Sequence, residues 1–156
     1  MSFYEMNRDR KKVKLIVDDT TIDVADCGTY FMVNGSVAGL TVTLPAIADA
    51  GPGWWCRFIV EGATAGNDVK IDLPSSDGVS GNGNDSMGAI LWGAPGQDYG
   101  YSDSNNEGHL DNVAFDSAAK RGSYLEFVCS GKTVTAEKFW YVNGLADGAG
   151  SILVNQ

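Results

Sequence analysis

Residues 40–44 read Leu-Thr-Val-Thr-Leu, and residues 69–73 read Val-Lys-Ile-Asp-Leu. In both stretches apolar and polar side chains alternate with a period of two, which is the pattern of a β-strand with one face buried. Short runs of β type also occur at 13–17, 21–24, 29–33, 56–61, 124–129 and 134–142, with weaker candidates at 89–92 and 152–154. No window of a dozen residues carries the apolar spacing of an amphipathic helix. The sequence therefore predicts an all-β fold.

The arrangement of these strands is predicted from their number and their turns. The segments Asn34-Gly35 and Ser130-Gly131-Lys132 tolerate the positive φ that tight hairpins require. Residues 124–129 are more apolar than the other alternating runs, which favours a central strand covered on both faces. Many short strands in a chain of 156 residues favour one β-sandwich domain, jelly-roll-like, which we place at 17–156.

Charge is distributed unevenly. The formal net charge is −9, yet residues 1–14 carry five basic and two acidic side chains. The acidic body repels phosphates and anionic lipids, so we expect neither nucleic acid nor membrane as a partner. Residues 1–16 are interpreted as an extended N-terminal arm, whose positive charge would pair with an acidic neighbouring subunit or assembly.

Composition argues against catalysis and metal binding. His109 is the single histidine, and no G-x-S-x-G or phosphate-binding loop is present. Cys27, Cys56 and Cys129 form no C-x-x-C pair, so a zinc site is not expected, and we interpret them as reduced, buried thiols. Their spacing alone leaves a disulfide open. We expect no enzyme, no metal and no cofactor.

One cation alternative stays open. Residues 103–108 imitate the opening of a calcium loop, although Ala114 stands where the twelfth-position glutamate belongs. A weak loop-bound cation on Asp98, Asp103 or Asp111 is the remaining form of that idea.

Residues 75–123 interrupt the strand pattern. This loop-rich excursion is full of Gly, Ser, Asn and Asp, but it also holds Trp92, Tyr99 and Tyr101. Long loops in compact domains are binding or subunit-contacting elements, and the apolar side chains in this one need burial. We predict that these three aromatic residues form oligomer contacts or, alternatively, stack on glycans. Trp54 or Trp55 is expected to close the end of the sandwich.

No apolar run approaches the roughly 18 residues of a membrane span. The first twelve residues are polar and charged where a secretory signal would be apolar. We therefore expect a chain that is neither transmembrane nor exported.

Several segments resemble a β-module of tailed-bacteriophage virion proteins. The Thr-Val-Thr-Leu-Pro of 41–45, the glycine-containing loop at 51–53 and the apolar strand at 56–60 begin the similarity. Its later parts are 69–73, the glycine-rich 78–83, the strand and turn at 124–132, and the Trp-x-Val-x-Gly of 140–144. The similarity covers roughly residues 29–144, and the excursion at 75–123 departs from the shorter modules.

The resemblance implies a structural virion protein, commonly a homotrimer, found either in capsid decoration (cement) proteins or in tail fibres and spikes. The small single domain and its oppositely charged arm favour a decoration protein. It would be made in the host cytoplasm and would bind the major capsid protein at the capsid surface. We expect the arm to supply the anchors Phe3, Tyr4, Met6, Arg8, Arg10, Lys11 and Lys12.

Two alternatives from other classes remain. One is a tail-fibre or adhesin-type carbohydrate-binding module that uses Trp92 or Tyr101. The other is a carboxylate-based hydrolase, although the 20 acidic residues single out no catalytic pair.

Overall fold

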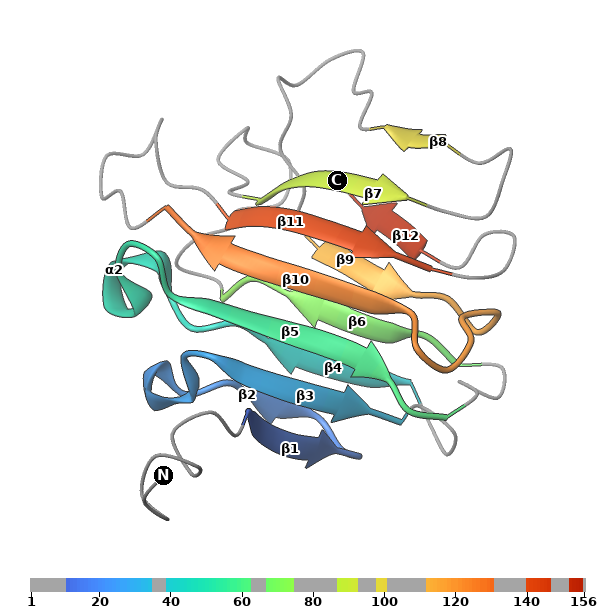
Figure 1. Ribbon diagram of the computed structural model, residues 1–156, viewed down its shortest axis with the longest axis horizontal. Helices are drawn as coiled ribbons and strands as arrows, with labels where there is room; N and C mark the ends of the chain where they lie inside the picture. Colours follow the sequence, from blue (N-terminus) through green and yellow to red (C-terminus); the bar gives the residue numbers. More distant parts are fainter. Residues whose placement is uncertain are drawn as a thin grey trace, which may run out of the picture.

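The computed structural model describes residues 11–34, 39–62, 67–74, 112–130 and 140–146, together with the backbone of 87–92, 98–100 and 152–155. Within these ranges the protein is mostly β, with two mixed sheets that are not closed into a barrel (Figure 1). The all-β prediction is confirmed at this level.

Figure 1 looks onto the seven-stranded sheet, with the five-stranded sheet behind it. The seven-stranded sheet runs, in order, β1 (Lys12–Ile16), β3 (Thr29–Val33), β5 (Trp55–Val60), β10 (Tyr124–Cys129), β11 (Trp140–Leu145), β7 (Met87–Trp92) and β8 (Asp98–Gly100). The five-stranded sheet runs β12 (Ile152–Asn155), β9 (Asn112–Phe115), β6 (Val69–Asp72), β4 (Leu40–Thr43) and β2 (Thr20–Thr21). Two short helices, the 3-10 turn η1 (Val24–Asp26) and α2 (Ile47–Ala50), lie in the connections. Neither helix in the described part is long and apolar enough to cross a membrane.

The first six strands alternate between the two sheets. Strands β1, β3 and β5 pair in parallel in one sheet, while β2, β4 and β6 pair in parallel in the other. The chain therefore passes alternately through the two sheets up to β6. The strand direction then reverses, because β9 pairs antiparallel with β6 and β10 pairs antiparallel with β5.

This winding corrects one predicted turn. We expected a tight hairpin at Asn34-Gly35, but β3 and β4 lie in different sheets, so that connection crosses between them. A residue that tolerates positive φ permits a tight turn without specifying one, so it cannot decide which strand comes next in the sheet. At the second predicted turn, Ser130-Gly131-Lys132, β10 and β11 are antiparallel neighbours, but Cys129 pairs with Trp140, so ten residues separate the paired ends and the predicted tight turn is wrong.

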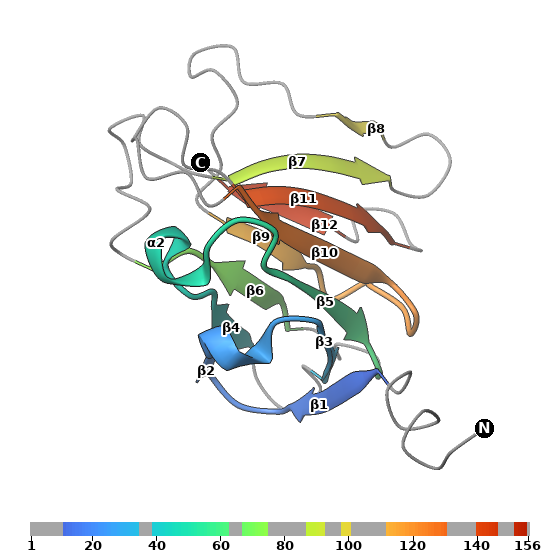
Figure 2. The same ribbon diagram turned by 60° about the vertical axis from the view of Figure 1, so that its left-hand side comes forward.

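The core lies between the two sheets, which form two layers in Figure 2. Alternate residues of the strands are buried, as the period of two predicts: Leu40 and Val42 in β4, Val69 and Ile71 in β6. On the seven-stranded side the core is aromatic. The rings of Phe31 and Phe58 stack with centroids 5.2 Å apart, and Phe127 meets Phe58 edge-on at 5.6 Å.

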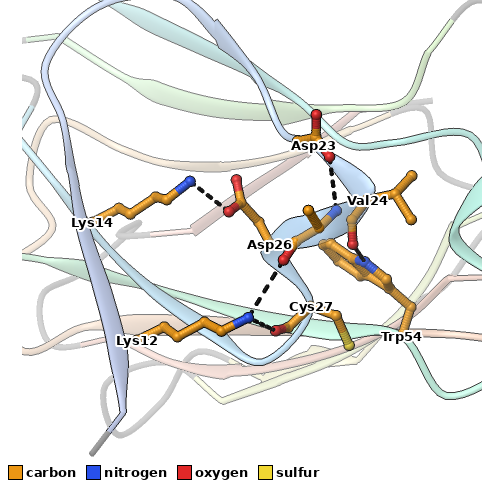
Figure 3. A network of polar contacts seen from close by, with 8 residues as sticks. Lys12, Lys14, Asp23, Val24, Asp26, Cys27 and Trp54 are labelled. Carbon is orange, nitrogen blue, oxygen red and sulfur yellow. Dashed lines mark hydrogen bonds and ion pairs between the residues drawn. The ribbon is translucent and has the colours of Figure 1, made fainter.

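Trp54 and η1 close one end of this core (Figure 3). Trp54 is buried, its Nε1 donates to the Val24 carbonyl at 2.8 Å, and its ring meets Trp140 edge-on at 5.5 Å. Asp23 caps η1, since its Oδ1 accepts the Ala25 N–H at 2.7 Å. Of the two tryptophans considered, Trp54 is thus the one that covers the core.

Lys12 and Lys14 of β1 contact η1 through their side chains. Their register partners Thr29 and Phe31 are buried, so both lysines leave β1 toward the core side of the sheet. Lys14 Nζ lies 2.5 Å from Asp26 Oδ1. Lys12 Nζ donates to the carbonyls of residues 25 and 27 at 3.4 Å (Figure 3).

One predicted boundary needs correction. Residues 12–16 were assigned to the arm, but they form β1 and pair with β3, so the folded domain includes them. The loop-rich excursion at 75–123 contributes β7, β8 and β9 to the two sheets, and β7 includes the weaker strand candidate at 89–92. The remainder of the excursion that precedes β9, and residues 1–10, lie outside the described residues.

The cysteines are free, but not all are buried. Cys56 and Cys129 are buried as predicted, whereas Cys27 is exposed in the turn after η1, which contradicts that prediction. Burial raises the pKa of the Cys56 thiol well above its usual value, and nearby Cys27 adds to the shift. Cys56 therefore acts as a small, neutral core side chain.

Candidate interaction surface

The side of the seven-stranded sheet that faces away from the core carries a continuous set of apolar side chains. We name it the outer face and define it as the outward-pointing residues of β1, β3, β5, β10 and β11. One of its cross-strand rows is apolar from edge to edge, and its members are Leu15, Met32, Ile59, Tyr124 and Leu145. Leu15 and Leu145 are 59% and 51% exposed at the two ends of this row, and the three residues between them are half-buried.

The neighbouring row carries the only charged residues of the outer face. It consists of Val13, Tyr30, Arg57, Glu126 and Asn143. Arg57 Nε donates to Glu126 Oε2 at 2.9 Å, and a guanidinium nitrogen, Nη2, also contacts that oxygen. Asn143 Nδ2 donates to the other carboxylate oxygen at 3.4 Å.

Aromatic rings flank the Arg57 guanidinium on both sides. Its Cζ lies 4.7 Å from the ring centroid of Tyr124 and 5.6 Å from that of Tyr30. Tyr30 in turn meets Trp55 edge-on at 5.8 Å. Cation–π contacts and a shared ion pair order these long side chains, so the centre of the face is preorganised.

A third row, Trp55, Val128 and Tyr141, is uncharged. Among the described residues, six large apolar side chains are notably exposed, and five of them belong to this side of the sheet. They are Val13, Leu15, Tyr141 and Leu145 of the outer face, and Val17 directly after β1. Exposed apolar side chains at both ends of one sheet face, with half-buried apolar ones between them, are typical of a surface that contacts another protein.

The exposed side of the five-stranded sheet has a different chemistry. Its outward residues in β2, β4 and β6 are Thr21, Thr41, Thr43, Lys70 and Asp72. A shallow hollow of about 260 Å³ lies there, lined by Asp19 and the threonines of β2 and β4. The threonine hydroxyls and the charged side chains of Lys70 and Asp72 are well solvated, so this side of the protein is suited to contact with water. Most of the exposed apolar side chains lie on the other sheet, at the outer face.

The predicted anchors are only partly described. Phe3, Tyr4, Met6, Arg8 and Arg10 lie outside the described residues. Lys11 and Lys12, expected to contact a neighbour, contact their own domain. Lys11 Nζ lies 5.2 Å from the ring centroid of Tyr30, and Lys12 binds the carbonyls after η1.

The three aromatic residues of the excursion are placed only by their backbone. Trp92 in β7 is the register partner of Leu145, and Tyr99 in β8 is the partner of Leu91. Tyr101 lies outside the described residues. Within the described ranges, no group of three His, Cys, Asp or Glu side chains is placed to hold a metal ion.

No protein-family model matches this sequence, and no curated protein matches it.

Proposed function

We propose that this chain is a structural virion protein of a tailed bacteriophage. In this proposal it is a capsid decoration protein that binds the major capsid protein at the capsid surface and stabilises the lattice as a homo-oligomer. The family resemblance implies that the oligomer is a homotrimer. No catalytic step is involved, since the protein acts through the surfaces that it buries against its neighbours.

The outer face is the observation that carries this proposal. Its exposed apolar rows lie on a rigid sheet, which is how a permanent structural contact is built. The arm is the second support. It enters the domain at β1, an edge strand of the same sheet, so the basic residues Arg8 and Arg10 precede the outer face directly in the chain.

We also infer that the two sheets form a β-sandwich. The core residues of both sheets make one cluster, which supports this reading. The jelly-roll description finds less support, because a jelly roll is an antiparallel architecture and the pairs β1–β3–β5 and β2–β4–β6 are parallel.

A truncation tests the attachment to the capsid. Deleting residues 1–10 leaves β1 intact, so the circular dichroism spectrum and the melting temperature should match those of the full chain. Co-sedimentation with capsids of the encoding phage should fall to background. The matched control is the full-length variant Arg8→Ala/Arg10→Ala, which should weaken binding only partly because it keeps the apolar anchors. Undiminished binding of the truncated chain would refute the proposed role of the arm.

A carbohydrate-binding module is a second candidate, favoured by one observation. The hollow beside β2 and β4 presents four threonines and Asp19, and hydroxyl and carboxylate oxygens are suited to sugar hydroxyls. Asp19 Oδ1 also accepts the Thr41 N–H at 2.7 Å, which holds this carboxylate in place. A glycan array that shows no binding at high protein concentration would dismiss this candidate.

A further inference from the structure

We propose that the outer face is the surface through which two copies of this chain associate. The half that carries Arg57 (β1, β3 and β5) lies on the half of the other copy that carries Glu126 (β10 and β11). The inference rests on the self-association in the proposed function, but it assigns a pair of copies in place of the homotrimer that the resemblance implies, because a two-fold face joins two chains. It concerns self-association alone and does not require the capsid.

The dimensions of the outer face suit such a contact. Two rows across five strands about 4.8 Å apart, and a third row across β5, β10 and β11, with rows about 6.8 Å apart, give a flat area of roughly 420 Å². The accessible area of side chains in relief exceeds the flat area, so the outer face supplies at least half of the roughly 800 Å² per partner of a stable interface.

The charges on the face identify the occupant. Arg57 on β5 is the only outward charge of β1, β3 and β5, and Glu126 on β10 is the only outward charge of β10 and β11. Placing identical halves over one another would bring like charges together. A two-fold rotation that places each half over the opposite half brings Arg57 near Glu126 of the second copy in both directions. The face is therefore complementary to itself.

Burial of these two charges is also prepared within one copy. Arg57 already contacts Glu126 and lies between two tyrosine rings, and Asn143 donates to the carboxylate. Charges that enter an interface already paired and hydrogen-bonded lose less on desolvation than isolated ones. The apolar rows on either side of the pair can then exclude water from the contact.

Charge reversal tests the pairing. Arg57→Glu gives a face with two acids and Glu126→Arg a face with two bases. Each variant alone should dissociate at least tenfold more readily than the wild type in sedimentation equilibrium. A 1:1 mixture should form a complex of two chains, because each acidic face then meets a basic one. Four results would overturn the two-fold pairing. They are a wild type that is monomeric at 100 μM, a wild-type mass of three chains, variants that associate as the wild type does, and a mixture that stays monomeric.

A second pair of variants guards against misfolding. Leu145→Glu changes a side chain that is 51% exposed, and Val24→Glu changes one that is 39% exposed but lies in η1, away from the outer face. Both should fold as the wild type does. Only Leu145→Glu should weaken association, again by at least tenfold. Equal association constants for the two variants would overturn the assignment of the interface.

The failure of this inference and that of the proposed function are distinguishable. A chain that forms pairs through the outer face but does not sediment with capsids overturns the decoration role and leaves the interface standing. A monomer that binds capsids overturns the interface and leaves the decoration role standing.

Discussion

Replacing Phe58 with alanine should be among the most damaging single changes in the core. Phe58 lies in β5, inside the seven-stranded sheet, and its side chain is fully buried. It connects the aromatic core, because Phe31 stacks on one side at 5.2 Å and Phe127 meets it edge-on at 5.6 Å. The substitution removes both ring contacts and leaves a cavity between the sheets.

The expected loss follows from these contacts. A buried Phe→Ala change lowers the free energy of unfolding by about 3–5 kcal/mol, including the cavity. Each aromatic pair contributes about 0.5–1.5 kcal/mol of this. Phe58→Leu keeps most of the apolar volume and loses chiefly the ring geometry, so it should cost about 1–2 kcal/mol. Natural domains have only about 5–15 kcal/mol in total, so the alanine variant should lose a fifth or more of its stability.

Urea denaturation followed by tryptophan fluorescence measures both variants. With a slope of about 2 kcal/mol per molar urea, Phe58→Ala should lower the midpoint by roughly 2 M and Phe58→Leu by less than 1 M. All samples need the same protein concentration, because association stabilises the folded state. If Phe58→Ala costs under 1 kcal/mol, the two sheets do not pack around this residue and the described core is wrong.

Three further changes test the end of the core, one turn and the buried thiol. Trp54→Phe removes the indole donor and leaves the Val24 carbonyl with only the Cys27 N–H at 3.4 Å, so it should lower the free energy of unfolding by about 0.5–1.5 kcal/mol in urea denaturation; an unchanged free energy would show that the indole hydrogen bond does not stabilise the fold. Gly28→Ala forces a side chain onto a φ of +78° and should cost about 1–2 kcal/mol, whereas Gly39→Ala should change stability by less than about 0.5 kcal/mol; similar losses at both sites would contradict a conformational cause. Cys56 has a raised pKa in the folded protein, so its contribution to stability is complete below the unfolded pKa near 8.5 and is lost at higher pH, by up to about 1.4 kcal/mol per pH unit. Melting temperatures in reductant between pH 7.5 and 9.5 should therefore fall more steeply for the wild type than for Cys56→Ala, and parallel curves would refute the buried neutral thiol.

Local patterns predicted which residues form strands, but not which strands are neighbours. The alternation in 40–44 and 69–73 correctly separates core from outward residues, because the period of two depends only on the strand itself. The parallel pairing of β4 with β6 depends on segments about 25 residues apart, and nothing in either strand specifies it. The two-residue strand β2 and the strands β8 and β9 give too weak a pattern to identify, whereas β7 includes the weaker candidate at 89–92.

The outer face shows the same division. Residues 124–129 are more apolar than the other runs and so predict a central strand, and β10 does lie inside its sheet with half-buried outward residues, Glu126 among them. The ion pair of Arg57 and Glu126 joins strands almost 70 residues apart, so only the register of β5 and β10 brings it together. The charge of the arm can be counted from the sequence alone. A surface row formed by residues of five strands can be recognised only once the strand pairing is known.

The two lysines on the core side of β1 have a consequence for whether another chain can add to this edge of the sheet. An open edge strand is a template for adding another chain, which leads to fibrils and precipitates. Pairing one more apolar strand with the free edge of β1 would bury the ammonium groups of Lys12 and Lys14 among apolar side chains. It would also break their contacts with η1. Edge-to-edge polymerisation is thereby disfavoured at this end, and contacts across the broad sides of the molecule, which close after a fixed number of copies, are left as the permitted route.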